Sequence, residues 1–239
     1  MDELNEQEAF LARCAIDVEV HALRPDYRAL LLVVDGLEPS TTSEAVDDLV
    51  TAAERRAREL VAERPLEEHP HIAAWRDAYR AFGAKPQRTR NSVEALTRRA
   101  VDALPRVNAL TDAYNAISVL QQVPIGGEDR TAYRGAARLV RAAGDEPFDT
   151  VAGGEPVIEH PERGEVVWRD DDGITCRRWN WRQGRRTALR DDTTDALFIL
   201  DALGPMSDAD LQFAGDALAD ALRQLGRQVR IARRVVRGS

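Results

Sequence analysis

The stretch Gly173-Ile-Thr-Cys-Arg-Arg-Trp-Asn-Trp-Arg-Gln-Gly-Arg-Arg-Thr187 holds five Arg, two Trp and one Asn in fifteen residues, and it contains no carboxylate. The whole chain of 239 residues carries a net charge of −8, so this stretch reverses the charge locally. Arg pairs with phosphates, and bases stack on Trp or Arg planes, which indicates a surface for an anionic, flat ligand such as a nucleic-acid end. Two Trp half-buried in a strand and covered by Arg stems would give the same composition.

Strand geometry divides this stretch into two faces. We expect a strand here, and successive side chains of a strand point to opposite sides of its sheet. Asn180 then shares a face with Arg178 and Arg182, while Trp179 and Trp181 lie on the other face. We therefore predict that Asn180 and Arg182 face a pocket and that at least one of the two Trp belongs to the core.

The sequence on both sides of this stretch predicts further strands. Upstream, short apolar runs alternate with Gly and Pro, a spacing typical of an antiparallel sheet with tight turns, at residues 138–142, 148–151, 156–158 and 165–168. Downstream, the continuous apolar run at 196–200 predicts a buried strand. Ser207 then caps an amphipathic helix that extends to about residue 225, and the basic tail over 227–239 is expected to fray.

The N-terminal part of the chain predicts a strand pair followed by a helix. Residues 15–20 alternate apolar and acidic side chains, and residues 29–34 form an apolar run. We expect these two segments to pair as antiparallel strands. Thr41 and Glu44 have the spacing of a capping box, which predicts a helix ending near residue 62.

Two more helices are predicted before residue 105. One begins at Pro70 and ends near Gly83, with Ile72, Trp75 and Tyr79 on a single buried stripe. The other starts at a second capping box, formed by Asn91 and Glu94, and is ended by Pro105. A basic patch of six positive and two acidic residues extends from Lys85 to Arg106 and includes Arg88.

A helix over residues 108–120 carries a line of short polar side chains. Asn108, Asp112 and Asn115 recur at spacings of four and three, so they share one side of the helix. Solvated helix faces usually carry Lys, Glu and Arg, which favours the wall of a polar site over a solvated face. The Gly126-Gly127 pair that follows predicts a turn, with Glu128 and Asp129 beside it.

Composition excludes several classes of protein. No apolar run approaches the length of a membrane span, and the acidic start is unlike a secretory signal. Cys14 and Cys176 fit neither a disulfide framework nor a metal spacing, which indicates the reducing cytoplasm. His69 and His71 cannot share a helix face, so we expect no metal and no cofactor. The net negative charge argues against a protein that coats DNA.

These elements predict a single α+β domain over residues 1–239, with a mixed or antiparallel sheet flanked by helices. The order of its motifs resembles the B3/B4 domain: Pro105-Arg-Val-Asn-Ala-Leu-Thr-Asp-Ala-Tyr-Asn115, then Pro-Ile-Gly-Gly-Glu-Asp, then a meander ending in Arg-Trp-Asn-Trp-Arg. That domain is best known in the β subunit of phenylalanyl-tRNA synthetase and also occurs as free-standing proteins. The resemblance covers residues 81–203 and leaves out residues 1–80 and the helix at 207–225.

The resemblance implies an editing site that hydrolyses the ester of a wrongly charged tRNA, with free-standing members acting in trans. The helix of Asp112 and Asn115 and the turn at 125–129 would line its pocket. One position departs from the family pattern: the synthetase has a His in this turn, and this chain has Gly126. Activation of water by that His therefore cannot be carried over.

The residues of the motifs can still be given roles in ester hydrolysis. Glu128 would orient or deprotonate water, and Asn180 or the backbone N–H groups of Gly126 and Gly127 would stabilise the oxyanion. Asp112 or Asp129 would hold the α-ammonium of the substrate, with Asn108 and Asn115 on the same wall. The tRNA acceptor end would be held by a set of basic residues and an aromatic ring, namely Lys85, Arg88, Arg178, Arg182 and Trp181.

Three functions remain open at this point. The first is an aminoacyl-tRNA deacylase acting in trans on tRNA. The second is a tRNA-binding module without catalysis, which the missing His supports. The third is a hydrolase or binding protein for another small amino-acid derivative. Cys176 as a nucleophile is disfavoured, because the sequence places no His or Asn partner near it.

Overall fold

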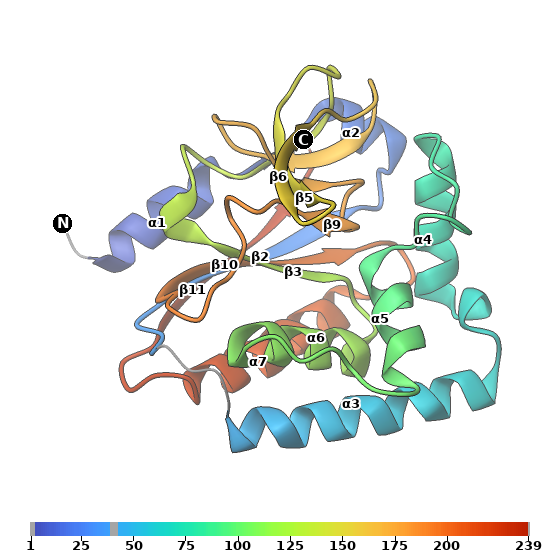
Figure 1. The fold of residues 1–239 in the computed structure, drawn as a ribbon, viewed down its shortest axis with the longest axis vertical. Coiled ribbons are helices and arrows are strands. Elements are labelled where there is room, and N and C mark those ends of the chain that lie inside the picture. The colour runs from blue at the N-terminus through green and yellow to red at the C-terminus, as the bar shows by residue number, and fades with distance from the viewer. Residues whose placement is uncertain (1–2, 39–42, 239) are drawn as a thin grey trace.

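The computed structural model describes residues 3–38 and 43–238 and arranges them in three layers (Figure 1). A central sheet lies in the middle, with long helices packed against one face. A second sheet and an extra hairpin lie on the opposite face. The α+β class predicted from the sequence is confirmed.

The central sheet has four strands, all paired antiparallel. In spatial order they are β11 (Arg230–Arg237), β2 (Arg28–Asp35), β10 (Asp195–Ala202) and β3 (Ile125–Asp129). The two inner strands, β2 and β10, are covered on both faces, which is why their sequences are continuous apolar runs. Both strands were predicted at these positions.

Helices α3 (Glu44–Glu63), α6 (Ala109–Gln121) and α7 (Asp208–Arg223) cover one face of this sheet. The side chains of Asn108 and Ser207 accept backbone N–H groups of the first turns of α6 and α7, which is the local reason why these two helices start there. Ser207 forms a capping box with Asp210 on α7, as predicted. Ser43 occupies the cap position of α3, and the predicted cap Thr41 lies outside the described residues.

Helices α4 (Pro70–Ala81) and α5 (Ser92–Ala100) lie at one edge of the molecule (Figure 1). The predicted stripe of α4 is confirmed, because Ile72, Trp75 and Tyr79 are all fully buried. The side chain of Asn91 caps α5 by accepting the Glu94 N–H at 3.0 Å. A short 3-10 helix, Leu66–Glu68, precedes α4.

The second sheet has five strands. In spatial order they are β1 (Ala15–Ile16), β4 (Arg138–Arg141), β7 (Val166–Arg169), β8 (Ile174–Arg177) and β9 (Arg182–Gln183). The hairpin of β5 (Phe148–Ala152) and β6 (Glu155–Glu159) forms a separate two-stranded sheet. The strands predicted between residues 138 and 168 are confirmed.

Two expectations for the chain ends are wrong. The N-terminal segment forms helix α1 (Glu3–Arg13), the short strand β1 and helix α2 (Val18–Leu23), because the Asp17 side chain accepts the Glu19 N–H and starts a helix. Strand β1 pairs with β4 in parallel, so β1 and β2 are not partners. The basic tail does not fray, since residues 230–237 form β11 against β2.

No helix among residues 3–38 and 43–238 is long and apolar enough to cross a membrane.

Candidate functional site

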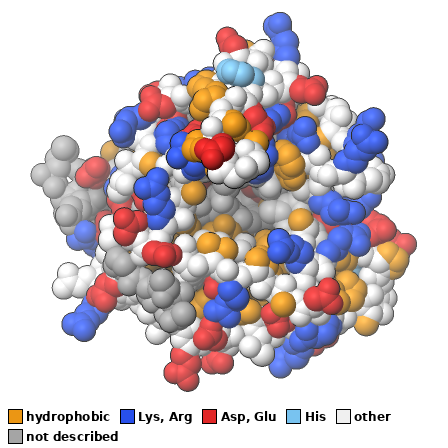
Figure 2. Space-filling view, viewed as in Figure 1, with side chains coloured by type: hydrophobic (Ala, Val, Ile, Leu, Met, Phe, Trp, Pro, Cys, Tyr) orange, Lys and Arg blue, Asp and Glu red, His pale blue; other side chains and the backbone are white. Residues whose placement is uncertain are grey.

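A cavity of about 230 Å³ lies between the two sheets, beside helices α5 and α6. Strand β3 and strand β10 form its floor, and the segment after β8 forms its opposite wall. In Figure 2 this face of the molecule is hollowed at its centre, below the β5–β6 hairpin. The cavity brings together side chains from six segments that are far apart in the sequence, among them Tyr114, Asn115, Glu128, Trp168, Cys176, Trp179, Asn180, Trp181, Gln183, Ile199 and Asp201.

The segment after β8 is a turn and not the strand that was predicted. The strand ends at Arg177, and the next two residues, Arg178 and Trp179, adopt φ values of 48° and 67°. The N–H of Trp181 donates to the Arg177 carbonyl at 3.1 Å, which closes the turn. The expected alternation of side chains between two faces therefore fails here.

The turn is stabilised by the burial of one of its two Trp. Trp179 is fully buried, with its ring centroid 4.9 Å from that of Tyr27 and 5.4 Å from that of Trp75. Trp181 instead lies at the cavity wall, where Arg178 and Arg182 stack on its ring at 4.6 and 4.9 Å. The prediction that at least one Trp belongs to the core is confirmed, although for a different geometric reason.

Asn180 lies at the centre of a buried polar network at one end of the cavity. Its Oδ1 accepts a hydrogen bond from the Tyr79 hydroxyl at 2.9 Å, and its Nδ2 donates to Asp201 Oδ2 at 3.3 Å. The hydroxyl of Tyr27 donates to the other oxygen of Asp201 at 2.5 Å. An amide nitrogen carries two donors, and the second N–H of Asn180, a residue that lines the cavity, has no partner within the described residues.

Asp201 is a site residue that the sequence did not reveal. Burial raises its pKa to about 7, against hydrogen bonds from Tyr27 and Asn180 that lower it. The one available signal was an acidic residue directly after the apolar run at 196–200. Such a residue is also common at a strand end, and here the strand continues to Ala202, which carries Asp201 into the interior.

Glu128 lines the same cavity from strand β3. It is 1% exposed and accepts a hydrogen bond from the Tyr133 hydroxyl. Burial raises the pKa of Glu128 to about 7, and the hydrogen bonds from Tyr133 and Thr175 oppose this rise. Glu128 pairs with Leu197, which lies four residues before Asp201 on β10. The Cα atoms of Glu128 and Asp201 are therefore about 13 Å apart along the strand direction.

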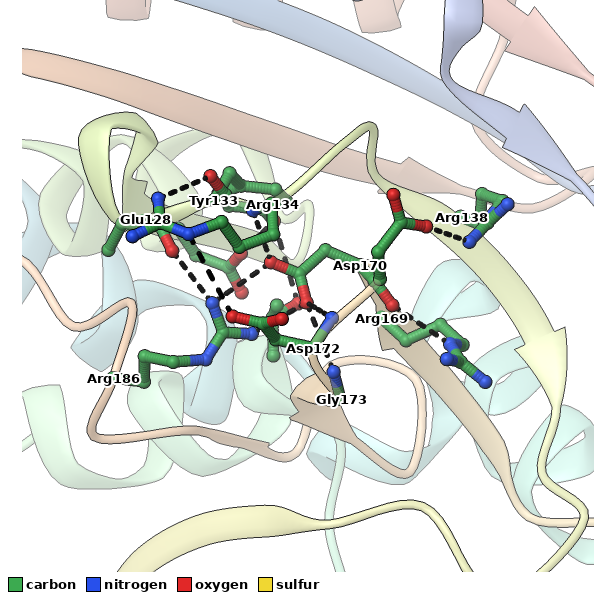
Figure 3. A network of polar contacts seen from close by, with 12 residues as sticks. Glu128, Tyr133, Arg134, Arg138, Arg169, Asp170, Asp172, Gly173 and Arg186 are labelled. Atoms are coloured by element: carbon green, nitrogen blue, oxygen red, sulfur yellow. Dashed lines mark hydrogen bonds and ion pairs between the residues drawn. The ribbon is translucent and has the colours of Figure 1, made fainter.

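A neighbouring carboxylate shows what an ion pair does in the same surroundings (Figure 3). Asp170 is fully buried, and Arg186 donates to both of its oxygens, at 2.7 and 2.9 Å. Arg186 also donates to the Ala132 carbonyl at 2.7 Å. Asp170 is thereby neutralised and fixes the turn before β8, whereas Glu128 has no ion-pair partner among the described residues.

The Gly126-Gly127 pair lies within strand β3, so the prediction of a turn is wrong. Gly126 lines the cavity, and a Cβ there would lie 3.1 Å from Gln183 Nε2. Gly127 faces the helical layer, because a Cβ there would lie within 2.9 Å of atoms of Leu189, Phe198 and Tyr114. The two glycines therefore serve opposite faces of the sheet.

Three of the predicted polar residues are engaged elsewhere and do not line the cavity. Asn108 caps α6 by accepting the Thr111 N–H at 2.9 Å. Asp112 accepts from Arg106 at 2.7 Å and from the Val107 N–H at 2.8 Å. Asp129 accepts the Thr131 N–H at 2.9 Å. Of the predicted line on α6, Asn115 is the residue that lines the cavity.

The predicted tRNA-binding residues fall into two places. Arg182 and Trp181 lie at the cavity. Lys85, Arg88 and Arg178 line a separate groove of about 330 Å³. Arg178 connects the two places, because its guanidinium lies over the Trp181 ring.

The four histidines lie away from the cavity, whereas one of the two cysteines lines it. None of the four histidines, all within the described residues, lines the cavity. His71 accepts N–H groups from Trp75 and Leu203 on one ring nitrogen, and burial lowers its pKa to about 4. Cys176 lines the cavity, and burial raises the pKa of its thiol well above the usual range. The residues that the structure describes contain no cluster able to hold a metal ion.

Comparison with known proteins places the chain in a family. No curated protein matches it. A crystal structure of an N-terminal fragment of the phenylalanyl-tRNA synthetase beta-subunit from Pyrococcus horikoshii is similar, with 12% sequence identity and a TM-score of 0.46. The match covers 93% of this chain and 50% of that one, so the chain spans half the length of that fragment. The model of the B3/4 domain matches residues 74–229, and the chain therefore belongs to the B3/4 domain family.

Proposed function

We propose that this chain is an aminoacyl-tRNA deacylase that acts in trans, hydrolysing the ester that links a wrong amino acid to tRNA. The observation that carries the proposal is the buried carboxyl of Glu128, which faces a small cavity, has no ion-pair partner among the described residues and has a pKa of about 7. A carboxyl with this pKa is suited to general base catalysis near neutral pH. Membership of the B3/4 domain family supports the reaction class.

The chemistry requires little beyond positioning, because an aminoacyl ester is already activated. Water attacks the ester carbonyl carbon while Glu128 accepts one of its protons. The free N–H of Asn180 donates to the developing oxyanion. The tetrahedral intermediate then collapses: the bond between the carbonyl carbon and the ribose oxygen breaks, and the ribose oxygen takes the proton from Glu128. The products are the free amino acid and the tRNA hydroxyl.

Asp201 is the candidate for holding the α-ammonium group of the substrate. It lines the cavity beside Asn180, whereas Asp112 and Asp129 are engaged in capping and ion pairs away from it. A bound ammonium would lower the pKa of Asp201 and keep it ionised at neutral pH. The α-ammonium lies one carbon from the ester carbonyl, which matches the contact between Asp201 and Asn180.

The test is a panel of mischarged tRNAs incubated with the protein, with release of labelled amino acid as the measurement. We expect release from at least one member. Asp201→Asn should raise KM more than it lowers kcat, because it removes a binding interaction present before the reaction. Asp129→Asn is the comparison variant, and a larger rise in KM for Asp129→Asn would contradict the assignment to Asp201.

The panel also separates the alternative functions. A protein that binds tRNA but releases no amino acid from any member would be a tRNA-binding module, which the absence of a histidine from the cavity wall favours. A protein that binds no tRNA and hydrolyses a free amino-acid ester would act on another small amino-acid derivative. Either result would replace the proposed deacylase.

A further inference from the structure

A groove with an excess of positive charge runs beside the cavity and has no role in the chemistry described above. It lies between the loop after α4, which carries Lys85, Arg88 and Thr89, and the turn before β7, which carries Arg163. Arg178 closes the side of the groove nearest the cavity. These residues come from three segments that are distant in the sequence, and the fold brings their positive charges together.

Three of the four cations in this groove are unengaged. Most exposed Arg side chains of this protein form ion pairs, for example those of Arg80 and Arg138. Lys85, Arg88 and Arg163 are exposed, and none forms a side-chain hydrogen bond or ion pair within the part of the chain that the structure describes. Unpaired cations that converge on one groove are available to an external anion.

Two acidic residues also line the groove, the exposed Glu162 and the buried Glu165, so its four cations leave an excess of positive charge. Glu165 is 3% exposed and accepts two hydrogen bonds from Arg177, both at 2.8 Å. It also accepts the Arg178 backbone N–H at 3.2 Å, and its Oε2 lies 3.5 Å from Arg178 Nε, so Arg178 is ion-paired, whereas the other three cations form no ion pair within the described residues. Glu165 is thus neutralised from within, and it holds the backbone of the turn that carries Arg178.

Arg178 is fixed in place between the groove and the cavity. Its Nη1 donates to Thr89 Oγ1 at 2.6 Å, and its guanidinium stacks on Trp181 at 4.6 Å. Trp181 lines the cavity on the other side of this stack. A ligand that passes over the Arg178–Trp181 pair would therefore have one end in the groove and the other in the cavity.

We propose that the groove binds the phosphodiester backbone of a single-stranded RNA end whose terminal acyl group enters the cavity. This inference rests on the proposed function, and it assigns Lys85, Arg88, Arg163 and Arg178 to successive phosphates of the strand. The groove adjoins the cavity at the Arg178–Trp181 pair, and an acyl group on the end of a single strand can reach across this pair. The guanidinium groups of Arg178 and Arg182 cover the Trp181 ring, so a base between the phosphates and the acyl group would stack on one of these guanidinium planes.

Lys85 gives a direct test, because it is the only lysine in the sequence. The protein is treated with an amine-acetylating reagent, and modification of Lys85 is followed by mass spectrometry. We expect a short single-stranded RNA ending in CCA to slow this acetylation several-fold. A blunt RNA duplex or an acidic peptide should give little protection. Equal protection by the acidic peptide, or none by the RNA, would overturn the proposal.

A triple variant, Lys85→Ala with Arg88→Ala and Arg163→Ala, tests the contribution of charge. Three phosphate contacts give a salt dependence of about −0.7 each for a single strand, so the slope of log K against log salt should become less negative by about 2. The matched control replaces Arg13, Arg58 and Arg190 by Ala; these three cations are exposed, form no ion pair within the described residues and do not line the groove. An equal change of slope in this control would contradict a specific groove.

The two proposals fail in different ways. The triple variant should lower kcat/KM for aminoacyl-tRNA far more than for the aminoacyl ester of adenosine, which has no phosphodiester. Equal losses on both substrates would contradict the groove and leave the deacylase intact. Protection of Lys85 by RNA without any hydrolysis would support the groove and contradict the deacylase.

Discussion

The two faces of the central sheet differ in what they bury. Toward helices α3, α6 and α7 the sheet presents apolar side chains such as Phe198 and Leu200 of strand β10. Toward the second sheet the same strand presents Ile199 and Asp201, and β3 adds Glu128. Alternate residues of one strand thus contribute to a dry core on one side and to a polar cavity on the other.

The helical face of the sheet contributes most to stability, and the cavity face carries the candidate site. Burial of apolar groups against the helices stabilises the fold. Burial of Glu128 and Asp201 works against it, because each must give up a favourable ionised state in water. The buried carboxyls on the cavity face therefore lower the free energy of unfolding, and apolar burial on the helical face offsets this loss. Substitutions on the cavity face should mainly affect activity, and substitutions on the helical face should mainly affect stability.

Glu128→Gln should have the largest effect on activity. It removes the proposed base, so kcat for deacylation should fall by about 10²- to 10⁴-fold. The amide can still accept the hydrogen bond from Tyr133, so the protein should remain folded. Single-turnover kinetics on a mischarged tRNA give the rate, and circular dichroism gives the fold. An unchanged rate in a folded variant would remove Glu128 from the mechanism.

Leu200→Ala should have the converse effect on the helical face. Leu200 is fully buried among the side chains of that core and does not line the cavity. Loss of its buried methyl groups should lower the free energy of unfolding by about 3 kcal/mol. Denaturant titration measures this change. The folded fraction should keep a kcat within a few-fold of the parent protein, and a much larger loss would mean that the two faces are coupled.

The pH dependence of the free energy of unfolding should reveal how much the buried carboxyls of the cavity face destabilise the fold. The pKa of Glu128 is raised from 4.5 to about 7 by folding, so its ionised form is disfavoured in the folded state. Ionisation of Glu128 therefore has no effect on stability below pH 4.5. The free energy of unfolding then falls as the pH rises from 4.5 to about 7. At about 1.4 kcal/mol per pKa unit, the loss is of the order of 3 kcal/mol by pH 8.

The matched measurement compares the parent with Glu128→Gln at pH 4.5 and at pH 8. The variant should gain stability relative to the parent as the pH rises, and Asp201→Asn should behave in the same way because the pKa of Asp201 is also raised, to about 7. A stability difference that does not change with pH would show that these carboxyls are not desolvated.

The glycine pair of β3 offers the smallest and most closely matched contrast. Gly127→Ala places a methyl group within 2.9 Å of Leu189, Phe198 and Tyr114, so stability should fall by about 1–3 kcal/mol. Gly126→Ala meets only the end of the Gln183 side chain, so stability should change by less than about 0.5 kcal/mol. Thermal unfolding distinguishes them, and equal losses would contradict the assignment of faces.

Local signals in the sequence predicted much of the fold. Cap residues located the starts of α5 and α7, and continuous apolar runs located β2 and β10. The family match extends over residues 74–229 and so includes α7, beyond the predicted resemblance at 81–203. These features depend on contacts between residues close in sequence, or on burial alone.

The remaining features depend on contacts between distant residues. The left-handed turn at Arg178 and Trp179 forms because Trp179 packs on Trp75 and Tyr27, and no local pattern encodes this. For the same reason the sequence grouped Asn180 with Arg178 and Arg182, and it did not reveal Asp201. Six predicted residues do line the cavity, namely Asn115, Gly126, Glu128, Asn180, Trp181 and Arg182, whereas their roles stay predictions.

Strand order in the central sheet has a consequence for how the chain is made. Strand β2 is an inner strand, yet one of its two neighbours is β11, and 195 residues separate Asp35 from its partner Arg230. Until β11 leaves the ribosome, one backbone edge of the most apolar strand has no native partner. Such unpaired edges are prone to association with other chains. The yield of folded protein during synthesis should therefore depend on a chaperone, or on a low growth temperature, more than the stability of its fully buried core would suggest.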